Sequence, residues 1–170
     1  GIHSDKELVI DSSTIKINKS YEGIESENIT INGGDINIIS SDDGINAAGD
    51  STDVLTINNG NIYVNASGDG LDANGSIYVN GGTIIVDGPT DNGNGALDYD
   101  SKCIVKGGTL IAAGSSGMVQ GISSDSTQYG LLINFTNTYS AGTKISILYS
   151  NDNEVISYTP TKTFSSIVFS

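Results

Sequence analysis

The sequence predicts an all-β fold: a single-stranded parallel β-helix of about five coils that ends in a C-terminal antiparallel β-cap. Three observations support this prediction. Imperfect copies of one short motif recur along the chain, strand-like segments alternate apolar and polar residues, and no stretch has the period of an amphipathic helix. Repeats of this kind stack in register, so that each unit buries the apolar side of its neighbour.

The repeated motif is clearest at 69–75, where the sequence reads Asp-Gly-Leu-Asp-Ala-Asn-Gly. From Gly1 to Gly70, the motif glycines recur at intervals of 22, 21 and 26 residues. This spacing fits one coil of a parallel β-helix, whose equivalent strands stack about 4.8 Å apart. We expect the motif at a corner of each coil, where Gly70 provides a positive φ. Related copies lie at 1–5, 22–26, 43–47 and 94–100.

Each unit carries two short strands separated by a turn that is usually rich in glycine. The first strands lie at 8–10, 29–31, 55–57, 77–79 and 103–105, and the second at 15–17, 36–38, 62–64, 84–86 and 110–112. Each reads apolar, outward, apolar, which buries one face of the strand. Stacking then predicts two internal ladders of like residues. These are Ile10, Ile31, Ile57, Val79 and Val105, and Ile15, Ile36, Ile62, Ile84 and Leu110.

The repeat fades after Gly114, so we divide the chain into β-helix coils at 1–114 and a strand-rich cap at 115–170. Strand patterns occur at 131–135, 144–149, 154–158 and 164–169, with a hairpin turn at 151–153. Such a cap would cover the open end of the coil stack, whose backbone groups are otherwise unpaired. The chain opens inside a repeat and stops directly after a strand, so we expect that both ends are trimmed.

The composition limits the possible partners. The 170 residues include 20 acidic side chains, 7 lysines and no arginine, for a formal charge of −13. This excess of negative charge argues against nucleic acid as a partner, because nucleic-acid binding needs a basic surface. No apolar run is long enough to insert into a membrane as a helix. Cys103 is the only cysteine, which excludes an internal disulfide framework and favours a buried thiol.

Acidic side chains recur at two fixed positions of the motif, directly before the glycine and two residues after it. Stacked coils would place them in two neighbouring columns, with like charges about 5 Å apart. A hard divalent cation relieves that repulsion, and Ca²⁺ prefers carboxylate and amide oxygens. We therefore predict Ca²⁺ between coils; the alternative is that the acids only cap turns and face water. The predicted ligands are Glu22, Glu25, Asp43, Asn46, Asp69 and Asp72, with Asp98 and Asp100 as an extension.

Two tyrosines among the outward-facing strand positions are candidate sugar-binding residues. Tyr63 and Tyr78 could stack on the C–H faces of sugar rings. The alternative is that the cap or a second subunit covers them. The absence of tryptophan makes a flat platform for crystalline cellulose less favourable and shifts weight to acidic sugars bridged by a cation.

Several segments together resemble the carbohydrate-binding domain family of calcium-binding parallel β-helix proteins, which are related in fold to polysaccharide lyases. The segments are 20–25, 29–34, 41–48, 93–100 and 110–118. The resemblance implies a right-handed coil with bound Ca²⁺. It also implies a secreted or surface-attached bacterial protein that binds polysaccharides, such as cellulose or acidic sugars like pectin, without catalysis. Ser12 and Ser13 depart from the family pattern, because glycines usually occupy that turn.

Two other functions are compatible with the sequence. One is a structural stalk or filament subunit of the cell surface that self-associates through its coil ends. The other is a calcium-dependent polysaccharide lyase, which needs a base to remove a proton next to a uronate carboxylate. Lys102 and Lys106 are the candidate bases, although solvent-exposed lysine is the more common role. His3 has no recognisable catalytic partner.

Overall fold

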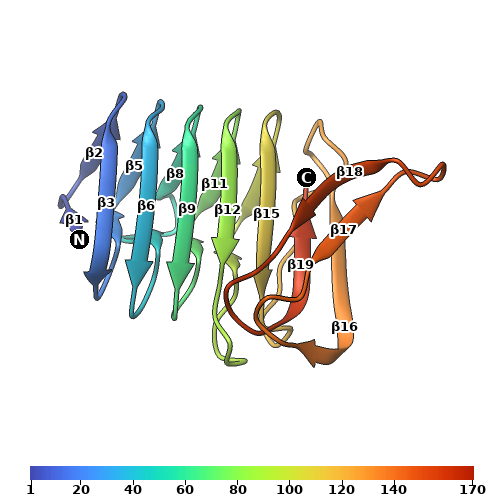
Figure 1. Cartoon of the computed structure of the whole chain (residues 1–170). Coiled ribbons are helices and arrows are strands. Elements are labelled where there is room, and N and C mark those ends of the chain that lie inside the picture. Colours follow the sequence, from blue (N-terminus) through green and yellow to red (C-terminus); the bar gives the residue numbers. More distant parts are fainter.

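The computed structural model describes all 170 residues and contains nineteen β-strands and no α-helix. It is a parallel β-helix in which three sheets, each with five parallel strands, wrap around one core (Figure 1). No helix in the structure has the length and apolar character needed to cross a membrane. In Figure 1 the near strands run downward, the distant ones run upward and the chain advances to the right, so the coil is right-handed.

The predicted strands form two of the three parallel sheets. Sheet B consists of β2 (Glu7–Ile10), β5 (Asn28–Ile31), β8 (Val54–Ile57), β11 (Ser76–Val79) and β14 (Lys102–Val105). The parallel part of sheet C consists of β3 (Thr14–Ser20), β6 (Asp35–Ser40), β9 (Asn61–Ala66), β12 (Thr83–Asp87) and β15 (Thr109–Gly114). The pairing register confirms both predicted ladders, from Ile10 to Val105 and from Ile15 to Leu110.

A third sheet corrects the prediction of two strands per coil. Sheet A consists of β1 (Ile2–His3), β4 (Ile24–Ser26), β7 (Ile45–Ala47), β10 (Leu71–Ala73) and β13 (Leu97–Tyr99). The acidic motif therefore forms a strand, where a corner was predicted. Strands of two or three residues are too short to show an alternating pattern, which explains why the sequence did not reveal them. Their first residues, such as Ile24, Ile45 and Leu71, are completely buried and complete the core.

The glycines of the coil have two different roles. The glycines that end the turns between sheets B and C have φ angles between 88° and 120°, as predicted for tight corners. The motif glycines do not have a positive φ, so the predicted corner role of Gly70 is wrong. A Cβ atom on Gly70 would lie 2.3 Å from Val86 Cγ1 and 2.4 Å from the Ala96 carbonyl oxygen. Gly70 is therefore required because the next coil packs directly against its backbone.

The turns between sheets B and C stack through a ladder of asparagine side chains. Asn80 Nδ2 donates to Asn58 Oδ1 at 2.8 Å, and Asn58 Nδ2 donates to Asn32 Oδ1 at 2.7 Å. The ladder ends where Asn32 Nδ2 donates to Asp11 Oδ1 at 2.8 Å. Each amide satisfies the amide in the neighbouring coil, so the ladder fixes the register of the turns.

The C-terminal segment covers the end of the coil stack, which confirms the predicted cap. β19 (Phe164–Phe169) pairs antiparallel with β15, and β16 (Leu131–Tyr139) pairs with β19, extending sheet C. The loop before β16 covers sheet B: the N–H groups of Ser123 and Thr127 donate to carbonyls of β14. Sheet D is the hairpin of β17 (Ile145–Leu148) and β18 (Glu154–Tyr158), which projects from the body (Figure 1).

Replacing Gly70 with alanine should destabilise the protein by roughly 1–3 kcal/mol, because the added methyl overlaps the neighbouring coil. Urea unfolding followed by circular dichroism measures the change. Gly33→Ala is the matched control, since a Cβ atom there meets only the Asp11 carbonyl oxygen at 3.3 Å. Equal stability of the two variants would contradict the packing role of Gly70.

Candidate functional site

The predicted column of acidic and amide side chains exists on sheet A. The second residue of each sheet A strand is paired in register with its equivalent in the next coil. Asp72 and Asp98 are carboxylates in adjacent coils and stack at the spacing of neighbouring β-strands, whereas Glu25 lies between His3 and Asn46. In order along the stack, the column consists of His3, Glu25, Asn46, Asp72 and Asp98.

A second column, directly before the motif glycines, is fixed by backbone hydrogen bonds. The Asp69 N–H donates to Asp43 Oδ1 at 2.6 Å. One coil later, the Gly95 N–H donates to Asp69 Oδ1 at 2.6 Å. The repetition of the same bond locks both carboxylates in place and occupies one oxygen of each. The second oxygen of Asp69 remains for another ligand, whereas that of Asp43 accepts a hydrogen bond of 3.2 Å from Asn46 Nδ2.

The two columns meet at Asp43, Asp69 and Asp72, whose carboxylates offer oxygens that all lie within 4.8 Å of one another. Next to this acidic trio, Asn46 is only 8% exposed, and its Oδ1 has no hydrogen-bond partner. Its Nδ2 donates to Asp43 Oδ2 at 3.2 Å, which orients the amide toward the trio. A second buried oxygen without a partner, Glu22 Oε2, lies in the same region. Buried oxygens without a partner are rare, and these two leave acceptor atoms free beside the trio.

The electrostatics of the trio favour uptake of positive charge. Burial, with added repulsion from neighbouring carboxylates, raises the pKa of Asp72 to about 7, of Asp69 to about 6 and of Glu22 to about 7. Burial also raises the pKa of Asp43. No ion pair connects the trio to a basic side chain. Only protons or a bound cation can neutralise this cluster.

The donor set fits a hard divalent cation. It consists entirely of oxygens, three of them from carboxylates and one from an amide, and it contains no imidazole or thiolate. Oxygen ligands of this kind are typical of Ca²⁺, whose flexible coordination tolerates donors that the backbone has positioned. Zinc and copper sites normally use nitrogen or sulfur.

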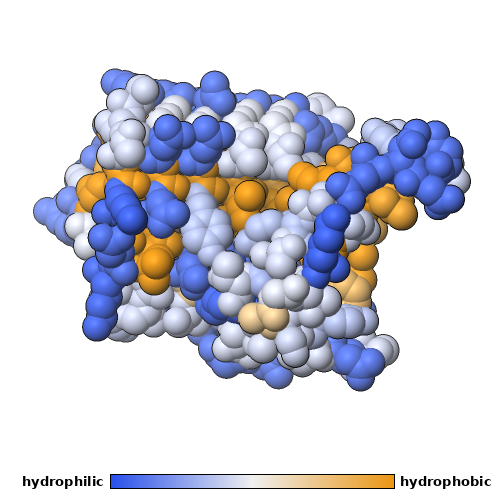
Figure 2. All heavy atoms as spheres, in the orientation of Figure 1, coloured by the Kyte–Doolittle hydropathy of each residue, from blue (hydrophilic) through white to orange (hydrophobic).

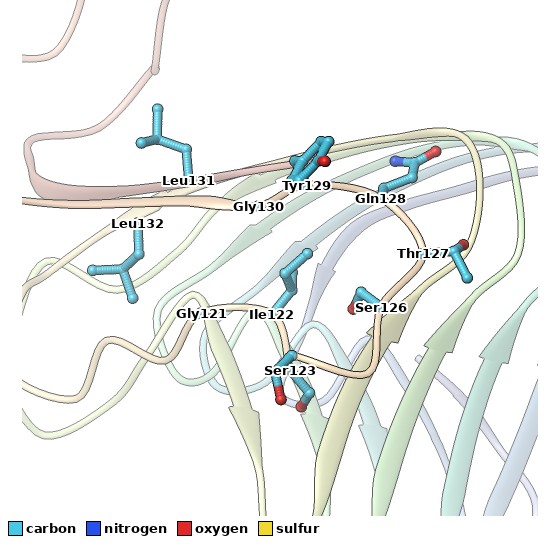
Figure 3. Close-up of a pocket in the computed structure, with 11 residues that line it drawn as sticks. Gly121, Ile122, Ser123, Ser126, Thr127, Gln128, Tyr129, Gly130, Leu131 and Leu132 are labelled. Carbon is cyan, nitrogen blue, oxygen red and sulfur yellow. The ribbon is translucent and has the colours of Figure 1, made fainter.

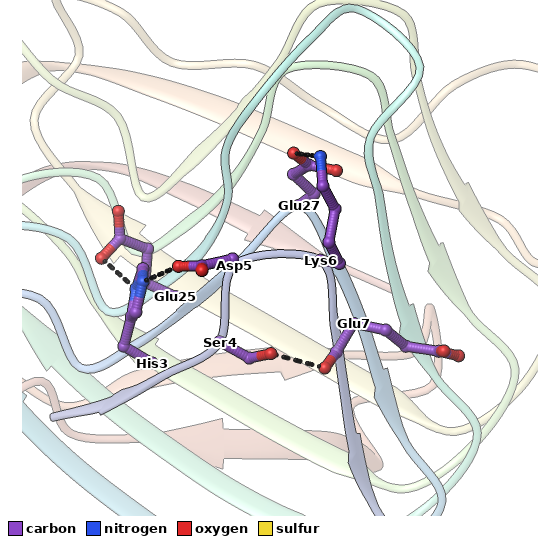
Figure 4. A network of polar contacts seen from close by, with 7 residues as sticks. All are labelled: His3, Ser4, Asp5, Lys6, Glu7, Glu25 and Glu27. Carbon is purple, nitrogen blue, oxygen red and sulfur yellow. Dashed lines mark hydrogen bonds and ion pairs between the residues drawn. The ribbon is translucent and has the colours of Figure 1, made fainter.

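The other predicted ligands lie outside the trio. Glu25 Oε2 contacts His3 Nδ1 at 3.0 Å, and His3 Nε2 contacts Asp5 Oδ1 at 3.1 Å (Figure 4). Hydrogen bonds to Asp5 and Glu25 raise the pKa of His3, so the imidazole partly balances the acidic column at its first coil. Asp98 is paired with Asp72 one coil further along, while Asp100 follows β13 and is exposed. Figure 4 also shows the ion pair of Lys6 with Glu27 in this coil.

The two candidate sugar-binding tyrosines lie on different sides of the β-helix and cannot form one platform. Tyr63 is on β9 of sheet C, and its Oη donates to Asp87 Oδ2 at 2.8 Å. Tyr78 is on β11 of sheet B, where Lys106 Nζ lies 5.9 Å from the ring centroid. Both rings are half-buried.

Lys102, one candidate base for a lyase, forms an ion pair with Asp125 of the loop that covers sheet B. The hydrogen bond to Asp125 raises the pKa of Lys102 further. A general base near neutral pH needs a lowered lysine pKa, so this environment acts against catalysis by Lys102.

The largest hollow on the molecule, of about 610 Å³, lies in the cap between the 121–130 loop and the start of β16 (Figure 3). Figure 3 shows Leu131 and Leu132 pointing to opposite sides of the strand, and Ile122 pointing up toward Gly130. Hydroxyl, amide and apolar groups line it, and it contains no carboxylate, lysine or histidine. It therefore provides neither a charged ligand nor an acid–base pair.

Sequence reasoning missed the buried carboxylate of Asp87, which is 1% exposed. It accepts hydrogen bonds from Tyr63 Oη and Tyr158 Oη, both at 2.8 Å, and from the Thr161 N–H at 3.0 Å. Asp87 lies at the end of β12, and its sequence position is typical of an ordinary turn residue. Its burial depends on a cap segment more than 70 residues away in the chain, and no local signal indicates that contact.

Comparison with known proteins adds one finding. A family model described as "Carbohydrate-binding domain-containing protein" matches residues 1–152. No curated protein and no solved structure matches the chain.

Without a divalent cation, stability should fall as the pH rises from about 4 to about 7. Unfolded carboxyls titrate near 4, whereas Asp72 and Glu22 in the folded protein titrate at about 7, so the folded state binds more protons in this window. Thermal melting in a chelator at stepped pH measures this. Asp72→Asn should be more stable than the wild type at pH 8 by roughly 1–2 kcal/mol, a figure reduced for solvent screening. A melting temperature that stays flat across the window would contradict it.

Proposed function

The chain belongs to this family of carbohydrate-binding domains, and from that premise we propose that it is a non-catalytic extracellular polysaccharide-binding protein with Ca²⁺ bound between its coils. The family match to residues 1–152 carries the carbohydrate-binding role. The convergence of three carboxylates from successive coils, beside the unpartnered Asn46 Oδ1, supports the calcium site.

In this proposal Asp43, Asp69, Asp72 and Asn46 hold the cation. Asp43 and Asn46 come from one coil, and Asp69 and Asp72 from the next, so the cation joins two coils. It would replace the like-charge repulsion between the stacked carboxylates with attraction to a shared positive charge.

Glu22, one coil earlier, is the candidate for an additional ligand or a second cation. Glu25, already engaged by His3, and Asp98 and Asp100 are weaker candidates.

The same site suggests a mode of binding for acidic sugars such as pectin. Ca²⁺ takes 6 to 8 oxygen ligands, and four side chains leave coordination positions for water or for a carboxylate of the ligand. The three carboxylates of the trio are only partly buried, so a ligand can approach them. A uronate could therefore bind through the cation, despite the formal charge of −13 on the protein.

An extracellular or cell-surface location is consistent with this chemistry. Calcium-binding modules outside cells operate with dissociation constants in the range of about 10⁻⁴ to 10⁻³ M. The proposed site is partly exposed and has only four protein side chains as ligands, so we expect its calcium affinity to lie in this weak range. At lower calcium the repulsion in the trio returns, which couples the stability of the β-helix to its surroundings.

Millimolar Ca²⁺ should raise the melting temperature of the wild-type protein at pH 7.5 and should stabilise Asp72→Asn much less, since the variant loses one charged ligand. Differential scanning calorimetry with and without a chelator measures both shifts. Asp152→Asn is the matched control, because Asp152 sits in the turn between β17 and β18, and asparagine tolerates its φ of 63°. Equal calcium effects on the wild type and Asp72→Asn would exclude this site.

Glycan binding should divide into two classes when an array is read with and without a chelator. Acidic glycans such as polygalacturonate should be retained only with Ca²⁺, and Asp72→Asn should lose them. Neutral glycans should not need the cation. Retention of polygalacturonate in the chelator would contradict bridging by calcium, and the absence of binding to any polysaccharide would contradict the proposed function itself.

A further inference from the structure

A shallow groove of about 440 Å³ crosses the outer face of sheet C, whereas the acidic trio is associated with sheet A. In Figure 2 a band of hydrophobic atoms crosses the upper half of this face, over β3, β6, β9 and β12. Four successive coils therefore contribute to one continuous surface. The groove is lined by Thr14, Ile15, Lys16, Asp35, Ile36, Asn37, Asn61, Ile62, Tyr63, Thr83 and Ile85.

Two rows of side chains run along the groove, with one member of each row from every coil. One row of hydrogen-bonding side chains follows the starts of the strands, in the register Thr14, Asp35, Asn61 and Thr83. A second row lies two residues further along each strand, and it becomes apolar toward the cap, in the register Lys16, Asn37, Tyr63 and Ile85. Equivalent residues in neighbouring coils are about 4.8 Å apart, and the two rows are separated by roughly 7 Å.

We propose that this groove binds an extended neutral polysaccharide that lies along the axis of the β-helix, about one sugar per coil. Each sugar ring has a hydroxyl edge and an apolar C–H face. The first row offers hydrogen bonds to the hydroxyls, and Tyr63 and Ile85 of the second row offer apolar contacts to the C–H faces. The inference rests on the proposed polysaccharide-binding function and assigns a site for it.

Tyr63 is the strongest contact in the groove because its ring is held in place before any ligand binds. Its Oη donates to Asp87 Oδ2, and the same carboxylate accepts hydrogen bonds from Tyr158 and Thr161 of the cap. The ring itself remains half-exposed in the groove. A fixed aromatic ring loses little conformational entropy when a sugar stacks on it, so more of the contact energy contributes to binding. Asp87 thus acts as a positioning residue.

The charges in the groove favour a neutral glycan as its occupant. Lys16 and Asp35 are its only charged residues, and they cancel, although the protein as a whole carries −13. A polyuronate would add one negative charge per sugar to this acidic molecule, and the groove offers only Lys16 as a positive charge. A second copy of the chain would bring another −13 against the same face, which opposes association.

The test is binding of a hexamer of β-1,4-linked glucose, measured by isothermal titration calorimetry in a chelator, to the wild type and three variants. Tyr63→Leu should weaken binding by about fivefold to tenfold, as expected for the loss of one stacking contact. Tyr63→Phe keeps the ring but removes its hydrogen bond to Asp87, so its affinity should lie between those of the wild type and Tyr63→Leu. Tyr78→Leu makes the same change on sheet B and should have no effect. Thermal melting confirms that each variant is folded.

The outcomes separate this inference from the proposed function. If the wild type retains polysaccharides but Tyr63→Leu binds the hexamer as tightly as the wild type does, the groove is wrong and the function stands. Binding of polygalacturonate but not of the neutral hexamer would also overturn the groove. If Tyr63→Leu alters sedimentation and leaves glycan binding unchanged, the face contacts a second copy. Failure of the wild type to bind any polysaccharide would refute both proposals.

Discussion

In-register stacking of the coils is the constraint on which the rest of this structure depends. Each strand pairs with the equivalent strand one coil away, so every residue lies beside its counterpart in the repeat. For apolar residues this arrangement is favourable, and it produces the continuous core from Leu8 to Leu110. Asparagines also benefit, because Asn32, Asn58 and Asn80 satisfy one another. The same rule leaves the motif glycines no room for a side chain, since the next coil lies directly against them.

Stacking is unfavourable when the repeated residue is charged. The Asp43, Asp69 and Asp72 carboxylates are brought within 4.8 Å by the pairing that builds the core, and no basic residue offsets them. Backbone N–H groups satisfy one oxygen of Asp43 and of Asp69, and the raised pKa values show how unfavourable the remaining charge is. The geometry of the repeat and the chemistry of its acids are therefore the two observations on which the proposed cation site rests.

The cap changes the character of the β-helix near its C-terminal end. It closes sheets B and C through different elements: the loop before β16 covers β14, and β19 pairs with β15. It also reaches back along sheet C, where Tyr158 and Thr161 bind Asp87 and thereby fix Tyr63. The cap therefore both protects an exposed edge and shapes the outer surface of the preceding coils. The side chain of Tyr63 on sheet C is thereby held by a residue whose other partners lie in the cap.

A repeat with period-2 alternation fixes which residues stack, so the parallel β-helix, the two main ladders, the cap and the register of the acidic column could all be predicted from the sequence. The sequence also identified the members of the trio among its eight predicted ligands, although Glu25 is engaged by His3 and Asp100 is exposed. The third sheet is visible only in the tertiary structure, because its strands are too short to show a pattern in the sequence. The packing role of Gly70 and the burial of Asp87 also could not be predicted from the sequence. These features depend on contacts between coils or on a cap segment more than 70 residues away, where local sequence carries no signal.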